Sequence, residues 1–286
     1  MKKVILSIAI MIGIAVAATA QDKTVSSNAT VTNKFGHAIL PAAGDFALGI
    51  DAVPFLKYLG NMNNNSANIA APSFDGFPGR IYGKYFLNEN TAVRAKLFFD
   101  FGNDRQAHTV IEDGTVLNPD KTVVDYKTVT RNELKLSVGY EMRRGYRRLQ
   151  GFYGVEAGIG INKSDELYKY GNVMTVANAT PSTWDFTTNA ATNPASRTLE
   201  KRGGFGYEVG VGGFVGLEYF FAPKMSIGGE LGVSISGANN PIGKQKYQLV
   251  EGGAVKEHEN RVGQAGNANF HFKTNVGGSL FLMFHF

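Results

Sequence analysis

The sequence contains no cysteine among its 286 residues, and this absence removes several classes of structure. No disulfide framework can form, and no thiolate can bind zinc or act as a nucleophile. Lipid anchoring through a cysteine after the N-terminal apolar run is excluded for the same reason. The HExxH, GxSxG and P-loop motifs are absent as well. The sequence therefore offers no standard metal, hydrolase or nucleotide motif.

Long apolar runs are scarce, and the one that exists lies at the N-terminus. Lys2 and Lys3 precede an apolar run from Val4 to Ala18, and Ala18-Thr19-Ala20 forms a small-residue cleavage site. The run is shorter than the ~20 residues that a membrane-spanning helix needs. This layout predicts a secretory signal peptide over residues 1–20. Cleavage leaves 29 − 2 = 27 basic against 24 acidic residues, a net charge of +3 that is too small to indicate nucleic-acid binding.

The most informative pattern in the chain is the alternation of its last eighteen residues, Asn269–Phe286. Phe270, Phe272 and the following even positions up to Phe286 are apolar apart from one threonine and one glycine, whereas the odd positions are mostly polar or small. Side chains of a strand alternate between two faces, so this segment has one apolar face. In a soluble sheet that face would cover a core, whereas in a membrane barrel it would contact lipid.

Seven further segments alternate in the same way, and each is long enough for a tilted membrane strand, which takes ~9–11 residues. They are Asp45–Val53, Phe77–Leu87, Val93–Phe101, Thr128–Met142, Gly151–Asn162, Gly204–Phe221 and Met225–Ser236. Short connections follow the second, fourth and sixth segments. Long connections cover about Pro54–Gly76, Gly102–Lys127, Lys163–Gly203 and Gly237–Ala268. Tyr247–Glu257 reads as a hairpin with its turn at Gly252-Gly253.

This pattern predicts an all-β, transmembrane antiparallel up-and-down β-barrel of eight strands, with short periplasmic turns and long outer loops. Ten strands remain open if an outer hairpin enters the membrane. A β-sandwich is the competing fold, but aromatic residues at strand ends and the regular order of short and long loops favour the barrel. The predicted domains are the signal peptide (1–20), a short periplasmic segment (21–43) and the barrel (44–286).

Taken together, the signal peptide, eight strands, four long loops and terminal Phe286 resemble the small OmpA/OmpX/OmpW-type outer-membrane β-barrel proteins. The segment Leu40–Asp51 is similar to the start of such barrels. The resemblance implies location in the cell outer membrane, with Phe284 and Phe286 as part of a C-terminal assembly signal. It further implies outer-membrane lipids and the barrel assembly machinery as partners. These families include structural proteins, adhesins and narrow channels, so the resemblance leaves function open.

Charged residues on the predicted inner faces form the main candidate site. Basic residues concentrate on the second to fourth strands and glutamates on the fifth to seventh, so the two halves should pair across the lumen. The predicted charge network comprises Asp51, Arg80, Lys84, Arg94, Lys96, Arg131, Glu133, Lys135, Glu156, Glu208, Glu218, Glu230 and Lys273. Asp45, Asp100 and Glu141 are also predicted to point inward. Glycines on the fifth to seventh strands are expected to make room for the long basic side chains.

Two functions fit such an interior, a salt-bridged plug or an ion- or solute-selective pore. The near balance of the two signs favours the plug, because selective pores carry rings of one sign. We therefore predict a non-enzymatic outer-membrane barrel with a structural or surface-interaction role. The alternative is a narrow porin-like channel or a lateral pathway for small solutes.

A loop-based hydrolase is the least favoured function. His271 and Ser279 share a face but lie roughly 26 Å apart along a strand. His108 and His258 each have acidic neighbours in outer loops, a setting common for solvated histidines. No catalytic, metal or cofactor site is predicted. Trp184, the single tryptophan, could contact an unknown extracellular ligand or pack its loop onto the barrel rim, and both interpretations stay open.

Overall fold

The computed structural model describes residues 31–52, 79–114, 118–239, 241–263 and 268–286. The predicted signal peptide lies outside these residues, as do the whole first long loop, Pro54–Gly76, and residues 21–30 of the predicted periplasmic segment. In the described residues the chain forms thirteen strands. They are β1 (Phe46–Asp51), β2 (Gly79–Asn88), β3 (Thr91–Ile111), β4 (Thr122–Tyr146), β5 (Leu149–Lys169), β6 (Thr183–Asp185), β7 (Ala190–Thr192), β8 (Ser196–Arg202), β9 (Gly206–Ala222), β10 (Met225–Asn239), β11 (Gly243–Glu251), β12 (Ala254–Val262) and β13 (Ala268–His285).

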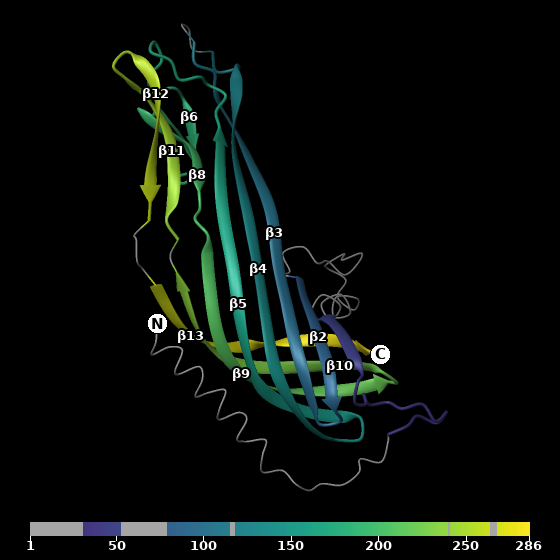
Figure 1. Ribbon diagram of the computed structural model, residues 1–286. Helices are drawn as coiled ribbons and strands as arrows, with labels where there is room; N and C mark the ends of the chain where they lie inside the picture. The colour runs from purple at the N-terminus through teal and green to yellow at the C-terminus, as the bar shows by residue number, and fades with distance from the viewer. Residues whose placement is uncertain (1–30, 53–78, 115–117, 240, 264–267) are drawn as a thin grey trace.

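Eight of these strands close into an antiparallel ring, which confirms the predicted barrel (Figure 1). The order around the ring is β1-β2-β3-β4-β5-β9-β10-β13. The ring closes through β1 and β13, where Leu48 faces Phe284, and through β5 and β9, where Val155 faces Gly213. The turns β2–β3, β4–β5 and β9–β10 are tight and lie at one end of the barrel, called here the turn end. The opposite end, which carries the long connections, is called the loop end.

The strands β3, β4 and β5 continue far beyond the other strands of the ring (Figure 1). The alternating segments end near Phe101, Thr128 and Asn162, but His108–Glu112 and Thr122–Lys127, which flank Asp113-Gly114, could extend the third and fourth strands above the membrane. The structure shows this extension, and β5 continues as well. The apolar outer face does stop near the ends of the alternating segments. The last apolar outward residues are Leu134 on β4 and Ile161 on β5, and the next outward positions toward the loop end are Asn132 and Lys163. The hydrogen-bonded ladder nevertheless runs on to the pair Ile111–Thr122. Polarity therefore marked where the lipid-type pattern ends rather than where the strands end.

Three further strands of the same sheet extend this wall at the loop end. Strand β8 pairs with the upper part of β5, β11 pairs with β8, and β12 pairs with β11. The β11–β12 hairpin turns at Gly252 and Gly253, whose φ values of 60° and 77° are readily adopted by glycine. The predicted hairpin is therefore confirmed, and its strands join the upper wall. The barrel ring keeps eight strands rather than ten.

The outer face of the ring carries a continuous belt of exposed apolar side chains. Its members include Leu136, Val138, Val155, Ile159, Val209, Val215, Leu217, Leu231 and Val233, each between 42% and 61% exposed. On β4 the outward side chains are apolar from Leu134 to Met142. This stretch is nine residues long, which is the length of a membrane-crossing strand. Exposed aromatic residues flank the belt, with Tyr85 and Phe286 at the turn end and Phe101 and Tyr207 at the loop end. The described residues include no helix with the length and hydropathy of a membrane-spanning helix.

Candidate functional site: the charged interior of the barrel

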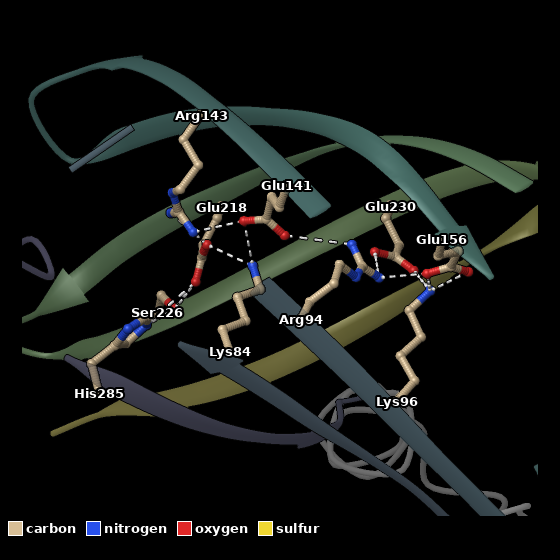
Figure 2. A network of polar contacts seen from close by, with 10 residues as sticks. All are labelled: Lys84, Arg94, Lys96, Glu141, Arg143, Glu156, Glu218, Ser226, Glu230 and His285. Atoms are coloured by element: carbon tan, nitrogen blue, oxygen red, sulfur yellow. Dashed lines mark hydrogen bonds and ion pairs between the residues drawn. The ribbon is translucent and has the colours of Figure 1, made fainter. Parts of the chain in front are cut away.

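Ten polar side chains in the barrel interior form one connected set of contacts (Figure 2). We call the following set the inner network: Lys84, Arg94, Lys96, Glu141, Arg143, Glu156, Glu218, Ser226, Glu230 and His285. The alternation of each strand points these side chains away from the apolar belt and into a barrel too narrow to leave them in bulk water. Contacts between opposite charges then replace lost hydration.

At the turn end, two cations and two carboxylates contact one another. Arg143 lies 2.9 Å from Glu141 Oε1 and 2.7 Å from Glu218 Oε2. Lys84 Nζ lies 3.0 Å from Glu141 and 3.3 Å from Glu218. All four side chains are at most 4% exposed. Each carboxylate therefore accepts from both cations, which is the arrangement that a buried ion pair needs to offset its desolvation.

In the middle of the barrel the charges continue from β3 to β5 and β10. Arg94 Nη2 lies 2.6 Å from Glu230 Oε2, and Lys96 Nζ lies 2.5 Å from Glu230 Oε1. Lys96 also contacts Glu156 at 3.0 Å. Arg94 links this group to the turn end through Glu141 at 3.5 Å. The two groups thus form one network along the barrel axis.

Aromatic rings fill the spaces between these charges. Lys84 Nζ lies 4.5 Å from the ring centroid of Phe152 and 5.2 Å from that of Phe281. The guanidinium carbon of Arg94 lies 3.8 Å from the ring centroid of Phe214. All three phenylalanines are buried. Cations over aromatic faces are attracted to the ring quadrupole, so the rings support the network as well as fill volume.

The interior glycines make room mainly for these rings, which corrects the sequence expectation in part. A Cβ on Gly216 would lie 2.2 Å from Phe152, and one on Gly228 would lie 2.4 Å from Phe281. Only Gly139 and Gly160 face long basic side chains, namely Arg94 and Lys135 at 3.2 and 3.0 Å. Gly154, Gly216 and Gly228 instead leave space for phenylalanine side chains from neighbouring strands. The alternation along a single strand does not show this packing.

Exposure of the basic side chains rises from the turn end toward the loop end. Arg143 is 1% exposed, Arg94 3%, Lys96 19% and Lys135 40%. Lys135 contacts Glu133 at 2.7 Å and Glu208 at 3.4 Å, in the more open part. The charged interior is therefore closed at the turn end and open at the loop end.

The other residues of the predicted charge network lie in varied places. Asp51 is buried, and Arg80 lies beside the ring of Phe98 at 6.0 Å. Arg131 is 57% exposed and pairs with Asp104 at 2.5 Å on the upper wall, so it was wrongly placed with the barrel charges. The strand runs on past the membrane belt, which carries Arg131 out of the lumen. The side chain of Lys273 lies outside the described residues.

Two further residues, Asp45 and Asp100, were predicted to point inward. Asp45 precedes β1 and pairs with Lys224 in the β9–β10 turn. Asp100 is exposed, lies near the middle of β3 and faces Glu133 on β4. Phe284 and Phe286 lie at the turn end with 37% and 70% exposure, and the main chain of Phe286 pairs with Phe46. Their role in assembly stays a prediction.

Sequence reasoning missed Arg143, Ser226 and His285 as members of the inner network. Arg143 follows the predicted strand Thr128–Met142 and was expected in the short connection after it, but β4 continues to Tyr146 and only Arg147 and Arg148 form the turn. The signal was available, because Arg143 continues the inward series Glu133, Lys135 and Glu141 by two-residue steps. The four arginines of residues 143–148 made the segment resemble a solvated turn, so the inward position of Arg143 was not recognised.

Ser226, His285 and Glu218 meet at the turn end without forming a catalytic relay. Ser226 Oγ donates to Glu218 Oε1 at 2.5 Å and lies 3.1 Å from His285 Nε2. Glu218 contacts the same histidine nitrogen at 3.4 Å, whereas a triad needs the acid on the other nitrogen. All three side chains are buried. This trio therefore packs the barrel end. Among the described residues, no group of three or more His, Asp or Glu side chains is arranged to hold a metal ion.

Trp184 lies on the inner face of the extended wall. It begins the short β6–β7 hairpin with Thr183, and its ring stacks on His108 of β3 with centroids 4.4 Å apart. The backbone N–H of Trp184 donates to the buried carboxylate of Asp125 at 2.8 Å. Trp184 therefore packs its loop onto the wall. Its contact with an extracellular ligand stays a prediction.

Asp113 fixes the same loop from its other side. Its carboxylate accepts from the backbone N–H of Ser182 at 2.8 Å and from the Asn178 amide at 2.7 Å. Burial alone would raise the pKa of Asp113, but the hydrogen bonds from Ser182 and Asn178 outweigh it and lower the pKa below its ordinary value. The charged form of Asp113 is thus part of the loop's structure.

Comparison with known proteins gives matches only among solved structures. No family model and no curated protein matches the chain. The outer membrane protein OprG from Pseudomonas aeruginosa is similar at 10% identity and a TM-score of 0.32, over 87% of this chain and 98% of OprG. A major outer membrane protein from Thermus thermophilus is similar at 13% identity and a TM-score of 0.35, over 86% of this chain and 99% of that protein. These values assign neither a ligand nor a role.

Proposed function

We propose that the chain is a non-enzymatic, integral outer-membrane β-barrel that does not conduct ions and has a structural or surface-interaction role. The observation that carries this proposal is the filled turn-end half of the barrel. Lys84, Arg94, Glu141, Arg143, Glu218 and Glu230 are each at most 5% exposed there and contact one another.

The outer surface supports a position in the membrane. An apolar belt with aromatic residues at both edges matches the hydrocarbon layer and its two interfaces. The predicted signal peptide would carry the chain across the inner membrane, and the strand lengths suit the thin hydrophobic layer of a barrel membrane.

The loop end supports the surface role. Strands β3, β4 and β5 rise above the belt, and β8, β11 and β12 widen this wall into a sheet (Figure 1). Its exposed charges occur mainly as neighbouring opposite pairs, such as Lys244–Glu259 at 2.6 Å and Lys246–Glu257 at 2.5 Å. These ion pairs connect neighbouring strands of the wall and help to keep its surface in one shape. A surface of fixed shape is suited to contact with another molecule.

Planar-bilayer recording on the purified, folded chain tests the proposal. We expect no steady single-channel steps, because Arg143, Glu218 and Lys84 are buried and contact one another across the turn end. Folding is verified first by heat-modifiable migration on a gel. Reproducible steps of one unit conductance would overturn the non-conducting role and support the narrow channel instead.

A further inference from the structure

The β4–β5 turn carries four arginines close together in the sequence. Residues 140–151 include Arg143, Arg144, Arg147 and Arg148. Arg143 points inward and belongs to the inner network. Arg148 donates to the main-chain carbonyls of Phe220 and Phe221 at 3.2 and 2.9 Å, which ties the turn to β9. Arg144 and Arg147 are exposed. The one acidic residue of this segment, Glu141, is buried in the interior.

Arg147 occupies a backbone conformation that arginine rarely adopts. Its φ of 53° lies in the left-handed region, where a two-residue hairpin turn usually has asparagine or glycine. Left-handed backbone costs an ordinary residue roughly 1–2 kcal/mol. Folding alone would favour asparagine or glycine here, so the side chain of Arg147 points to a role outside the fold.

The surroundings of the two arginines identify the kind of partner. Arg144 follows Tyr140 and Met142 along the outward face of β4, just beyond the edge of the apolar belt. Tyr146 and Leu149, which face each other across the hairpin, are 74% and 49% exposed. Guanidinium groups placed between apolar side chains at a belt edge match the depth of lipid phosphates, with aromatic and aliphatic groups in the adjoining acyl region.

We propose that the β4–β5 turn binds the anionic headgroup of a phospholipid through Arg144 and Arg147, with Tyr146 and Leu149 in contact with its acyl chains. The inference rests on the proposed position in the membrane and adds a lipid preference at one defined place. Planar guanidinium groups bind phosphate oxygens in pairs, and residues 142–151 bring four arginines and no acidic residue to this end of the barrel. A basic residue close to an anionic membrane surface gains about fivefold in association.

Fluorescence quenching by brominated lipid tests the site. The full mature chain with Tyr146→Trp is folded into vesicles of 70% phosphatidylcholine and 30% phosphatidylglycerol, with bromine on either lipid at the same mole fraction. The unchanged chain gives the background from Trp184, which lies at the loop end. We expect brominated phosphatidylglycerol to show about a fivefold higher local association than brominated phosphatidylcholine, and 0.5 M NaCl to reduce this preference.

Matched variants separate the outcomes. Arg144→Gln together with Arg147→Asn should abolish the preference, and Asn suits the left-handed position so the turn still forms. Arg131→Gln, which removes one positive charge at the loop end, should leave the preference intact. Equal quenching by both lipids, or an unchanged preference in the double variant, would overturn the headgroup site. Absence of quenching by either lipid would instead contradict the membrane position on which the site rests.

Discussion

Arg94 and Glu230 contact each other across the barrel interior at 2.6 Å, although 136 positions separate them in the sequence. They lie on β3 and β10, and both side chains are at most 4% exposed. A pair of this kind cannot be removed one partner at a time without leaving a charge in a dry interior. The contact therefore joins two strands on different sides of the barrel and at the same time fills part of its lumen.

Replacing Glu230 with alanine should lower the free energy of unfolding by about 3 kcal/mol or more, since Arg94 and Lys96 then lose their shared carboxylate. Urea titration of the folded fraction in detergent micelles measures the change. As a control, Glu259→Ala removes a carboxylate from an exposed pair with Lys244 and should leave the midpoint almost unchanged. A loss below about 1 kcal/mol for Glu230→Ala would argue against a dry, paired interior.

Adding one methyl group at Gly216 should disturb the aromatic packing. The new Cβ would lie 2.2 Å from Phe152 and 2.5 Å from the carbonyl of Gly229, so Gly216→Ala should cost about 1–3 kcal/mol. Gly83→Ala is the matched control, because a Cβ there meets nothing within 4 Å. The temperature at which the heat-modifiable band shifts reports both variants. Equal temperatures for the two would mean that Phe152 does not occupy this place.

Acid should release the Trp184 loop through Asp113. The pKa of Asp113 is lowered in the folded state, so its stabilising effect is complete above the ordinary value of 3.8 and is lost as the pH falls through the lower folded value. Emission from Trp184, the single tryptophan, should shift to longer wavelength in that range as Ser182 and Asn178 lose their acceptor.

Asp113→Ala should show the shifted emission already at pH 7, whereas Asp120→Ala should not. The backbone N–H of Asp120 bonds to Asn118, and its carboxylate is not needed for that contact. An emission maximum that stays constant from pH 7 down to pH 2 would contradict the role of Asp113.

The barrel could be predicted from the sequence because its main determinant is local. Two-residue alternation places Leu136, Val155 and Leu231 outward whatever their neighbours are, and all three prove exposed. The same parity placed Lys84, Arg94 and Glu218 in the interior, where they are buried. The tight turns and the β11–β12 hairpin follow from short signals of a few residues.

Other features depend on contacts between distant segments, and these could not be predicted. The place of Phe152 beside Gly216 follows from the register between β5 and β9, which no single strand encodes. The upper parts of β3, β4 and β5 pair with one another, and β5 pairs there with the distant strand β8. Arg131 was misplaced for this reason. It was assigned to the correct face of β4, but it lies above the charged interior of the barrel rather than within it.

A single-cysteine scan of β5 tests the account most directly, and the absence of native cysteine makes the background clean. Spin labels at positions 153–161 of the chain folded in lipid vesicles are measured for contact with oxygen, which concentrates in lipid, and with a water-soluble nickel reagent. We predict high oxygen contact at Tyr153, Val155, Ala157, Ile159 and Ile161, and low oxygen contact at the four positions between them. Accessibility without a two-residue period, or with its maxima at Gly154, Glu156, Gly158 and Gly160, would contradict a membrane barrel with an apolar exterior and a charged interior.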